Sequence, residues 1–350
     1  MKHITYYTSA LLFALFCTNA NSQDLTAYAN TIIGQNITNY THSINTIVFD
    51  MISTPSFTQS NHVHETTPSD LYGTMPTYGE YNDDGTIGRN GGDTNNATLN
   101  NIWINWQTSN NKTKFENAAI LDNRSNTIIA GITGNTYNIG KIKNTWGLYT
   151  GYTGGDQENK HIDIDEQGGI FGVFNKFSAQ NLNILTTLNA GTLNNNIKTS
   201  GGSDKTTNFW IDGATMATYD ISLDPSFIVR PALYAEYTWI KSDDYTSYSG
   251  AIINNENLHK FEISPRLSLI KHIANNWVAN ANVKYIINLN NDGTTIVNKN
   301  KIEQLDIDNY FEYGLSINKT VKNFNFNINI NRQDGAIYGW FGGFNLKYIF

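Results

Sequence analysis

The C-terminal segment of this chain alternates in polarity up to its last residue, Phe350. One parity is almost wholly apolar and aromatic and consists of Tyr338, Trp340, Gly342, Phe344, Leu346, Tyr348 and Phe350. Successive side chains of a β-strand point to opposite faces, so the pattern predicts a strand with one apolar face. A terminal strand of this kind is typical of a bacterial outer-membrane barrel, because lipid covers the outer face while water can fill the lumen.

The composition excludes the other way of crossing a membrane. The chain has 350 residues, of which 39% are hydrophobic and 15% are charged, and its mean hydropathy is −0.40. No run of about 20 apolar residues, the length that a spanning helix needs, occurs beyond the N-terminus. A barrel can be this polar, since only every second residue of a strand faces lipid. The predicted fold class is therefore all-β.

Four regions differ in their patterning. They are a predicted signal peptide at 1–22, an amphipathic helix at 23–53, an irregular linker at 54–100 and an outer-membrane β-barrel at 101–350. The first has a short apolar run followed by small residues, as a secretory signal does. The second has apolar residues at three- and four-residue steps, which is the period of a helix. The third has no period and is rich in turn-forming residues.

Cleavage after Ser22 would change the charge and the redox chemistry of the chain. It removes Lys2, which leaves 22 Lys and Arg against 30 Asp and Glu, a formal charge of −8. It also removes Cys17, the only cysteine, so that no disulfide can form. An acidic chain of this kind is a poor nucleic-acid binder, and we expect no nucleic-acid partner.

Twelve strands are predicted, an even number, as in a closed antiparallel bacterial barrel. The clearest alternation lies at 229–239, 261–269, 277–287, 311–317, 321–330 and 338–350. Less regular strands are expected near 102–107, 127–134, 145–153, 168–178, 182–192 and 209–220. The connections alternate between short turns and longer segments, which we expect at the outer side: 108–126, 154–167, 193–208, 241–257 and 288–301. This sorting is typical of outer-membrane barrels.

Charged residues occupy the parity opposite the lipid face and are expected to point into the lumen. They are Arg230, Glu236, Glu262, Arg266, Lys284, Glu312 and Lys347. Such groups can pair with one another, line a selective water path or hold a helix. The helix at 23–53 is expected in the lumen, where it could pack on aromatic residues such as Phe341. The alternative is a position at the membrane surface.

No catalytic, cofactor-binding or closed metal-binding motif stands out, and we do not expect an enzyme. The acidic run from His161 to Glu166 lacks the ordered spacing and the glycine of a calcium loop. It is predicted to be a solvated outer loop.

Several short motifs resemble the β-domain, or translocator, of autotransporters. They are Asn101-Ile102-Trp103-Ile104-Asn105, Trp146-Gly147-Leu148-Tyr149-Thr150-Gly151-Tyr152, Gly168-Gly169-Ile170-Phe171-Gly172, Ile228-Val229-Arg230-Pro231-Ala232-Leu233 and the closing strand from Gly335 to Phe350. The resemblance implies a helix that threads the barrel and joins it to a secreted passenger. Almost nothing lies between the predicted signal and the helix, so a minimal or absent passenger is expected.

Three functions follow as hypotheses. The first is an autotransporter-type barrel for secretion or surface display, the second a small porin or channel plugged by the helix, and the third an adhesin or structural protein acting through its outer loops. All three place the chain in the bacterial outer membrane, in contact with lipid. The resemblance implies that Phe344, Leu346, Tyr348 and Phe350 are an assembly signal for the insertion machinery, with periplasmic chaperones as earlier partners. A monomer is favoured.

Overall fold

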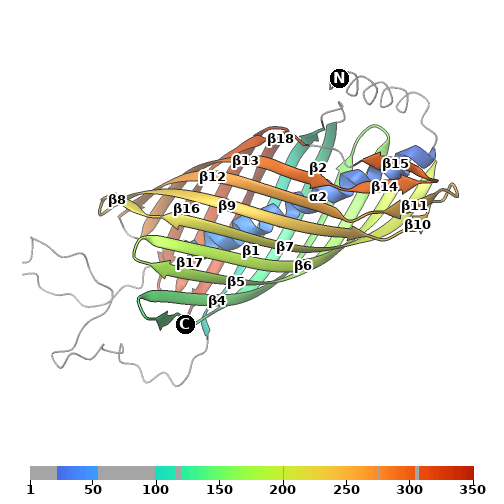
Figure 1. The fold of residues 1–350 in the computed structure, drawn as a ribbon. Helices are drawn as coiled ribbons and strands as arrows, with labels where there is room; N and C mark the ends of the chain where they lie inside the picture. The colour runs from blue at the N-terminus through green and yellow to red at the C-terminus, as the bar shows by residue number, and fades with distance from the viewer. Residues whose placement is uncertain (1–21, 54–98, 116–119, 200, 275, 304–306) are drawn as a thin grey trace, which may run out of the picture.

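The computed structural model describes residues 22–53, 99–115, 120–199, 201–274, 276–303 and 307–350 (Figure 1). One long helix, α2 (Ser22–Ser53), is followed by strands. The barrel strands are β1 (Leu99–Lys114), β2 (Ile120–Gly134), β4 (Ile142–Glu158), β5 (Ile162–Ala179), β6 (Leu182–Thr199), β7 (Gly202–Tyr219), β9 (Phe227–Ser242), β12 (Leu258–Ile273), β13 (Trp277–Asp292), β16 (Tyr310–Val321), β17 (Phe324–Gly335) and β18 (Ile337–Ile349). The predicted signal peptide up to residue 21 and the linker from 54 to 98 lie outside the described residues.

These strands form a closed antiparallel barrel of twelve strands within the part of the chain that the structure describes. Each strand pairs with its neighbour in sequence, and β1 closes the circle by pairing with β18, with Asn101 opposite Ile349 and Trp106 opposite Phe344. Closure leaves no strand edge exposed to lipid. The predicted fold class and strand number are confirmed.

The outer surface carries a broad band of apolar side chains, as the alternation in the second half predicts. On β17, Phe324, Phe326, Ile328 and Ile330 are exposed, whereas Asn325 and the other asparagines between them face inward. The inward row is polar, so water or polar groups must fill this side of the lumen. Among the described residues, no helix is both long and apolar enough to cross a membrane.

The strands of the first half are longer than predicted. β5, β6 and β7 have 18 residues each, whereas about 9–11 residues suffice to cross a bilayer. Five of the six predicted segments fall within observed strands, and the sixth, 209–220, passes the end of β7 by one residue. The predicted segments are shorter than the strands. The strands continue through most of the predicted outer loops at 108–126, 154–167 and 193–208, so the prediction of long loops there is wrong.

A reversal of polarity along the strands explains this error. In β5, Phe171 and Val173 are exposed on the lipid face, whereas Asp163 and Asp165 take the outward positions nearer the other end. In the same outer part, Ile162, Ile164, Leu193 and Ile197 are buried inside the barrel. Below the reversal apolar residues face lipid; above it polar residues face water and apolar residues face inward. The run at 161–166 is therefore largely strand and not a loop.

The end from which the strands project is the outer end, because outer-membrane barrels keep their tight turns on the periplasmic side. At this outer end β10 (Tyr245–Thr246), β11 (Ile252–Asn255), β14 (Thr294–Val297) and β15 (Asn300–Glu303) form a separate four-stranded sheet (Figure 1). It buries Ala251, Ile253 and Val297, and it occupies much of the predicted loops at 241–257 and 288–301. At the other, short-turn end lie two short strands, β3 (Tyr137–Ile139) and β8 (Ile221–Asp224), and the C-terminus.

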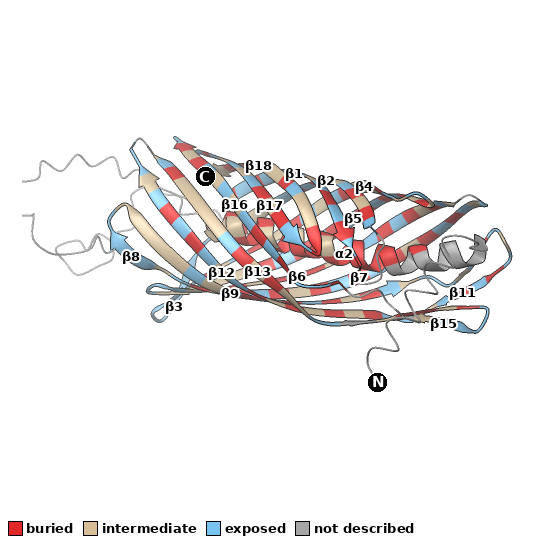
Figure 2. Cartoon of the chain, turned by 90° about the horizontal axis from the view of Figure 1, so that it is seen from above, coloured by how far each residue is buried: buried red, intermediate tan, exposed pale blue. Residues whose placement is uncertain are grey.

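Helix α2 lies inside the barrel, roughly along its axis (Figures 1 and 2). From Ile32 to Ser53, every residue of the helix is buried or half-buried. Its apolar residues pack with inward-facing wall residues such as Trp103 and Phe174. The lumen position is therefore the correct one of the two alternatives that the sequence leaves open.

Glycines make room for large aromatic side chains on the inner wall. Trp103, Tyr149, Phe174 and Trp210 are buried, and each lies directly opposite a glycine of the neighbouring strand: Gly131, Gly172, Gly147 and Gly191. A methyl group added to any of these glycines would lie within 2.3 Å of the ring. Two of these glycines, Gly147 and Gly172, belong to the autotransporter-like motifs at 146–152 and 168–172, where they make room for Phe174 and Tyr149.

Replacing Gly191 by alanine is expected to destabilise the barrel by about 1–3 kcal/mol, the usual cost of overpacking. The new Cβ would lie 2.2 Å from the Trp210 ring, which has no free space to move into because it is fully buried. The measurement is the urea midpoint of the folded, heat-modifiable form in detergent. Gly213→Ala on β7 is the matched control, since the nearest atom lies 3.9 Å away; equal midpoints for the two variants would contradict the prediction.

Candidate functional site

The candidate site is the lumen where α2 meets the barrel wall. At the C-terminal end of the helix, three basic side chains donate to the last backbone carbonyls. Lys347 Nζ lies 3.2 Å from Met51 O, Lys176 Nζ 3.3 Å from Ile52 O, and Arg230 Nη1 3.3 Å from Ser53 O. These carbonyls have no partner within a helix, and cations stabilise the negative end of the helix dipole. The arrangement fixes the C-terminus of α2 at the short-turn end.

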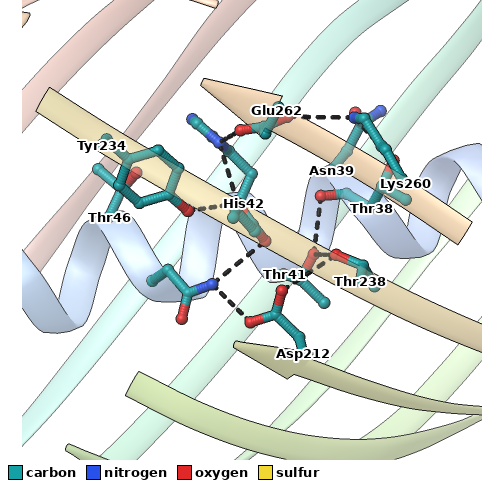
Figure 3. A network of polar contacts seen from close by, with 12 residues as sticks. Thr38, Asn39, Thr41, His42, Thr46, Asp212, Tyr234, Thr238, Lys260 and Glu262 are labelled. Atoms are coloured by element: carbon teal, nitrogen blue, oxygen red, sulfur yellow. Dashed lines mark hydrogen bonds and ion pairs between the residues drawn. The ribbon is translucent and has the colours of Figure 1, made fainter. Parts of the chain in front are cut away.

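Midway along the helix, His42 lies in a buried polar network (Figure 3). Its Nδ1 contacts a carboxylate oxygen of Glu262 and lies 3.4 Å from Glu236. Lys284 Nζ lies 3.0 Å from His42 Nε2. An ammonium group can only donate, so Nε2 accepts and the ring proton resides on Nδ1, which donates to Glu262.

Two lysines offset part of the negative charge that Glu236, Glu262 and Glu312 place around His42. Lys284 also lies 2.6 Å from Glu312 and 3.1 Å from the Thr46 hydroxyl. Lys260 Nζ lies 3.2 Å from Glu262 and 3.2 Å from the Thr38 hydroxyl. Buried ion pairs of this kind are costly to break on one side, because the remaining charge has no solvent.

One turn further along α2, Asn45 forms hydrogen bonds through both its amide nitrogen and its amide oxygen. Its amide donates to Asp212 at 2.6 Å and to Glu236 at 3.2 Å, and its oxygen accepts from Thr187 at 2.7 Å and Asn189 at 3.2 Å. Asn45 is fully buried, and these contacts satisfy its amide from three strands. The register of the helix against β6, β7 and β9 is thereby specified.

Towards the outer end, Glu166 accepts hydrogen bonds from Asn36, from Gln157 and from the Tyr40 hydroxyl, which lies 2.7 Å away. Glu166 is buried in the wall at β5, and its partners Asn36 and Tyr40 come from the helix. The acidic run therefore contributes one helix anchor, while Asp163 and Asp165 remain on the outer surface with Lys198.

The apolar face of α2 also finds a partner in the lumen. A single buried cluster joins Ile33, Ile37, Ile44 and Val48 of the helix to wall residues, among them Trp103, Ile164, Phe174, Leu193 and Trp210. Phe49 packs separately with Tyr234, with ring centroids 5.9 Å apart. The inner wall of the barrel therefore has an apolar side as well as a polar one. The apolar side packs against the apolar face of α2, which would have no partner in a wholly polar lumen.

All seven charged residues expected in the lumen contact the helix. Glu236, Glu262, Lys284 and Glu312 surround His42, Arg266 pairs with Asp50 at 2.8 Å, and Arg230 and Lys347 bind the terminal carbonyls. Sequence reasoning missed Asp212, Lys176 and Glu166, which lie on the less regular strands of the first half. Glu166 lies in the outer part of β5, where the polarity of the alternation reverses, whereas Lys176 and Asp212 share the inward parity of β5 and β7 with apolar residues. Lys260 shares the parity of Glu262, so alternation alone could have identified it.

His42, Glu236 and Glu262 present one ligand atom each within 4.8 Å of one another, as a metal site would. The ammonium of Lys284 at 3.0 Å from Nε2 and that of Lys260 at 3.2 Å from Glu262 lie beside these ligands. Two ammonium groups this close would repel a divalent cation. The cluster is a hydrogen-bonded anchor for the helix.

Phe344, Leu346, Tyr348 and Phe350 lie on the outward face of β18 and beyond its end. Tyr348 contacts Phe350, with ring centroids 5.3 Å apart, and Phe324 of β17 at 5.0 Å. The backbone nitrogen of Phe350 donates to Asn100 O at 3.1 Å, which joins the C-terminus to the first strand. These residues form an aromatic stripe beside the seam between β18 and β1.

A sequence profile described as the autotransporter beta-domain matches residues 102–331, which is more than half of the chain. The chain belongs to the autotransporter beta-domain family. As an autotransporter beta-domain it is an outer-membrane barrel of bacteria, as the lipid-facing band requires. A search of curated protein sequences gave no match.

Solved structures of autotransporter barrels share the fold. The transport unit of AIDA-I from Escherichia coli superposes with a TM-score of 0.60 at 14% identity, over 74% of this chain and 93% of that one. The translocator domain of NalP from Neisseria meningitidis gives 0.63 at 13%, over 74% and 90%. The beta domain of the Bordetella autotransporter BrkA gives 0.57 at 13%, over 72% and 100%. At these identities the likeness concerns the fold alone.

Proposed function

We propose that this barrel is an autotransporter-type translocator, which inserts into the outer membrane after removal of a signal peptide and leads its N-terminal end through the lumen for secretion or surface display. The observation that carries the proposal is the direction of α2. Thr38 binds Lys260 near the outer end of β12, whereas Ser53 binds Arg230 at the short-turn end. The chain therefore enters the lumen from the outer side and leaves it on the side where β1 begins.

The anchoring of α2 supports retention of the helix after assembly. Ion pairs and hydrogen bonds contact it from Asn36 to Ser53, and they come from strands distributed around the barrel. A helix held in this way closes most of the lumen and keeps its N-terminal end outside.

An epitope inserted between Ser22 and Gln23 tests the direction of transport. We expect antibody binding on intact cells, because the outer end of α2 is the N-terminal one. The matched control is the same epitope after Lys322, in the short turn between β16 and β17, which should bind antibody only after permeabilisation. N-terminal sequencing of the purified protein reports where the signal is removed. An N-terminal epitope that is reached only in permeabilised cells would refute the proposal.

A further inference from the structure

A buried carboxylate, Asp204, lies on the inner face of β7 in the part of the barrel beyond the membrane. The residue is 7% exposed. Lys205 and Thr207 occupy the outward positions next to it, and the lipid-facing Phe209 follows only further along the strand. Directly opposite Asp204 on β6 stands Ile197, which is fully buried. The carboxylate is therefore outside the lipid but in partly apolar surroundings.

Asp204 lacks the compensation that other buried carboxylates have. In the described part of the chain, at least two donors or cations contact each of the others, which are Glu166, Asp212, Glu236, Glu262 and Glu312. Asp204 Oδ1 accepts one hydrogen bond, from the backbone nitrogen of Tyr248 at 2.7 Å. Its Oδ2 has no donor and no cationic partner among the described residues. A buried charge of this kind requires a counter-charge or further donors.

Two more buried oxygen atoms beside Asp204 are without a donor. Thr206 follows two residues later on the same face of β7, and Asn195 of β6 lies directly opposite Thr206. The two residues are 5% and 3% exposed. Within the residues that the structure describes, Thr206 Oγ1 and Asn195 Oδ1 have no hydrogen-bond partner. Three oxygen donors of different chemistry are thus grouped on two neighbouring strands.

The hydrogen bonds of Asn195 determine the orientation of its amide. The nitrogen donates to the backbone oxygens of Leu193 and Thr206, each at 3.3 Å, and to Asn208 Oδ1 at 2.6 Å. Backbone carbonyls can only accept, so nitrogen and oxygen cannot be exchanged. On β7, Asn208 lies on the membrane side of Thr206 and Asp204 on its outer side. The amide oxygen is turned away from Asn208 and is free for a ligand beside Asp204.

The spacing of the three residues suits a single ion. Residues two apart on a strand are separated by about 6–7 Å, and the Cβ atoms of opposite residues by about 4.5–5.5 Å. Calcium binds six to eight oxygen atoms at about 2.3–2.6 Å, so its ligand atoms lie within about 5 Å of one another. Carboxylate and amide oxygens are among its usual ligands, and water completes the shell. The ammonium groups that exclude a cation at His42 have no counterpart here, because Lys198 and Lys205 face outward.

We propose that a calcium ion binds between β6 and β7 at the outer end of the barrel, with Asp204 Oδ2, Thr206 Oγ1 and Asn195 Oδ1 as ligands. The acidic run at 161–166 does not contribute to this site, since its Asp163 and Asp165 lie on the outer surface with Lys198. The inference concerns ion binding and is independent of secretion.

Calcium at this position stabilises the attachment of the outer sheet to the barrel wall. Tyr248 lies between β10 and β11 of that sheet and donates to the other oxygen of Asp204. The Tyr248 ring also lies against Gly202 at the start of β7, where an added Cβ would be 2.6 Å from it. An ion that fixes the Asp204 carboxylate therefore also fixes the acceptor that holds the sheet.

The experiment is a calorimetric calcium titration of the full-length protein, refolded in detergent without lipid. We expect one calcium ion per chain with a Kd of about 0.1–1 mM, the range of extracellular sites. Asp204→Asn, whose amide oxygen can still accept from Tyr248, should weaken the affinity by roughly tenfold or more, because ligand charge sets calcium affinity. Asp163→Asn is the matched control, since that carboxylate is 50% exposed on the neighbouring strand, and it should bind calcium like the wild type.

A protease experiment reports on the outer sheet. Trypsin cleavage after Lys299, in the exposed turn between β14 and β15, should be slower in calcium than in the chelator EGTA. Asp204→Asn should abolish this difference. Thr206→Val, which removes the hydroxyl at nearly constant volume, is the second variant should Asp204→Asn fail to fold, and it too should weaken binding.

Two results would overturn the proposal. The first is the absence of saturable calcium binding up to about 10 mM, well above the range of such sites. The second is an equal calcium affinity in the wild type and in the folded Asp204 or Thr206 variants. Either result would leave water as the partner of the three oxygen atoms, and the epitope experiment would remain unaffected.

Discussion

Deletion of Phe350, or its replacement by aspartate, is expected to lower the amount of folded barrel in cells by roughly tenfold or more. A charge near the membrane interface costs only about 0–1 kcal/mol, and a tenfold change requires about 1.4 kcal/mol. A loss of this size therefore requires recognition of the aromatic terminus by the insertion machinery. Heat-modifiable migration of the outer-membrane fraction measures the folded barrel.

The control for Phe350 is Phe324→Asp on β17. Phe324 is also exposed, and its ring lies 5.0 Å from that of Tyr348, so it is close to the same stripe. Phe324→Asp should assemble in cells nearly as well as the wild type. The Phe324→Asp and Phe350 variants should refold in detergent with similar yields. Unchanged assembly after deletion of Phe350 would show that Phe344, Leu346, Tyr348 and Phe350 serve only as a lipid-facing surface.

Replacement of Glu262 by alanine is expected to lower the free energy of unfolding by about 3–5 kcal/mol, the usual effect of removing one partner of a buried ion pair. Glu262 is 2% exposed and accepts from both His42 and Lys260. Its loss leaves the Lys260 ammonium without its carboxylate partner and the His42 ring N–H with only the more distant Glu236, at 3.4 Å. Urea titration of the folded form in detergent, read by heat-modifiable migration, gives the change.

Glu158→Ala provides the matched control for Glu262. Glu158 pairs with Arg124 at 3.4 Å on the surface, where its side chain is 49% exposed, and exposed pairs contribute at most about 1 kcal/mol. Glu262→Gln, which keeps one acceptor oxygen, should fall between the two. If Glu262→Ala unfolds at the same urea concentration as Glu158→Ala, the network around His42 does not anchor the helix.

The second-half strands were predictable because their parity is uniform. On β17, every apolar residue from Phe324 to Ile330 faces lipid and every asparagine between them faces the lumen. On β5, by contrast, Phe171 faces lipid but Asp165 takes the same outward parity beyond the membrane. Side chains still alternate between the two faces there, but the outward face changes from apolar to polar. A prediction that follows one apolar face therefore ends the strand too early.

The helix site was predictable only in part. The alternation of side chains along a strand places Glu262 and Lys284 in the lumen, and the helical spacing of apolar residues predicts an amphipathic α2. Both patterns are local properties of the chain. Neither pattern predicts that His42 meets Glu262, 220 residues away. That contact depends on strand order, which brings β9, β12, β13 and β16 around one face of the helix.

The sequence by itself determined the membrane-spanning fold, the lipid-facing side of the later strands and the inward direction of seven charges. These follow from the period of the side chains, which the backbone imposes wherever a strand forms. Only the tertiary structure decided that an apolar wall faces one side of α2 and a charged wall another. Barrel closure decides these points, because it places strands from both halves of the chain around the same helix.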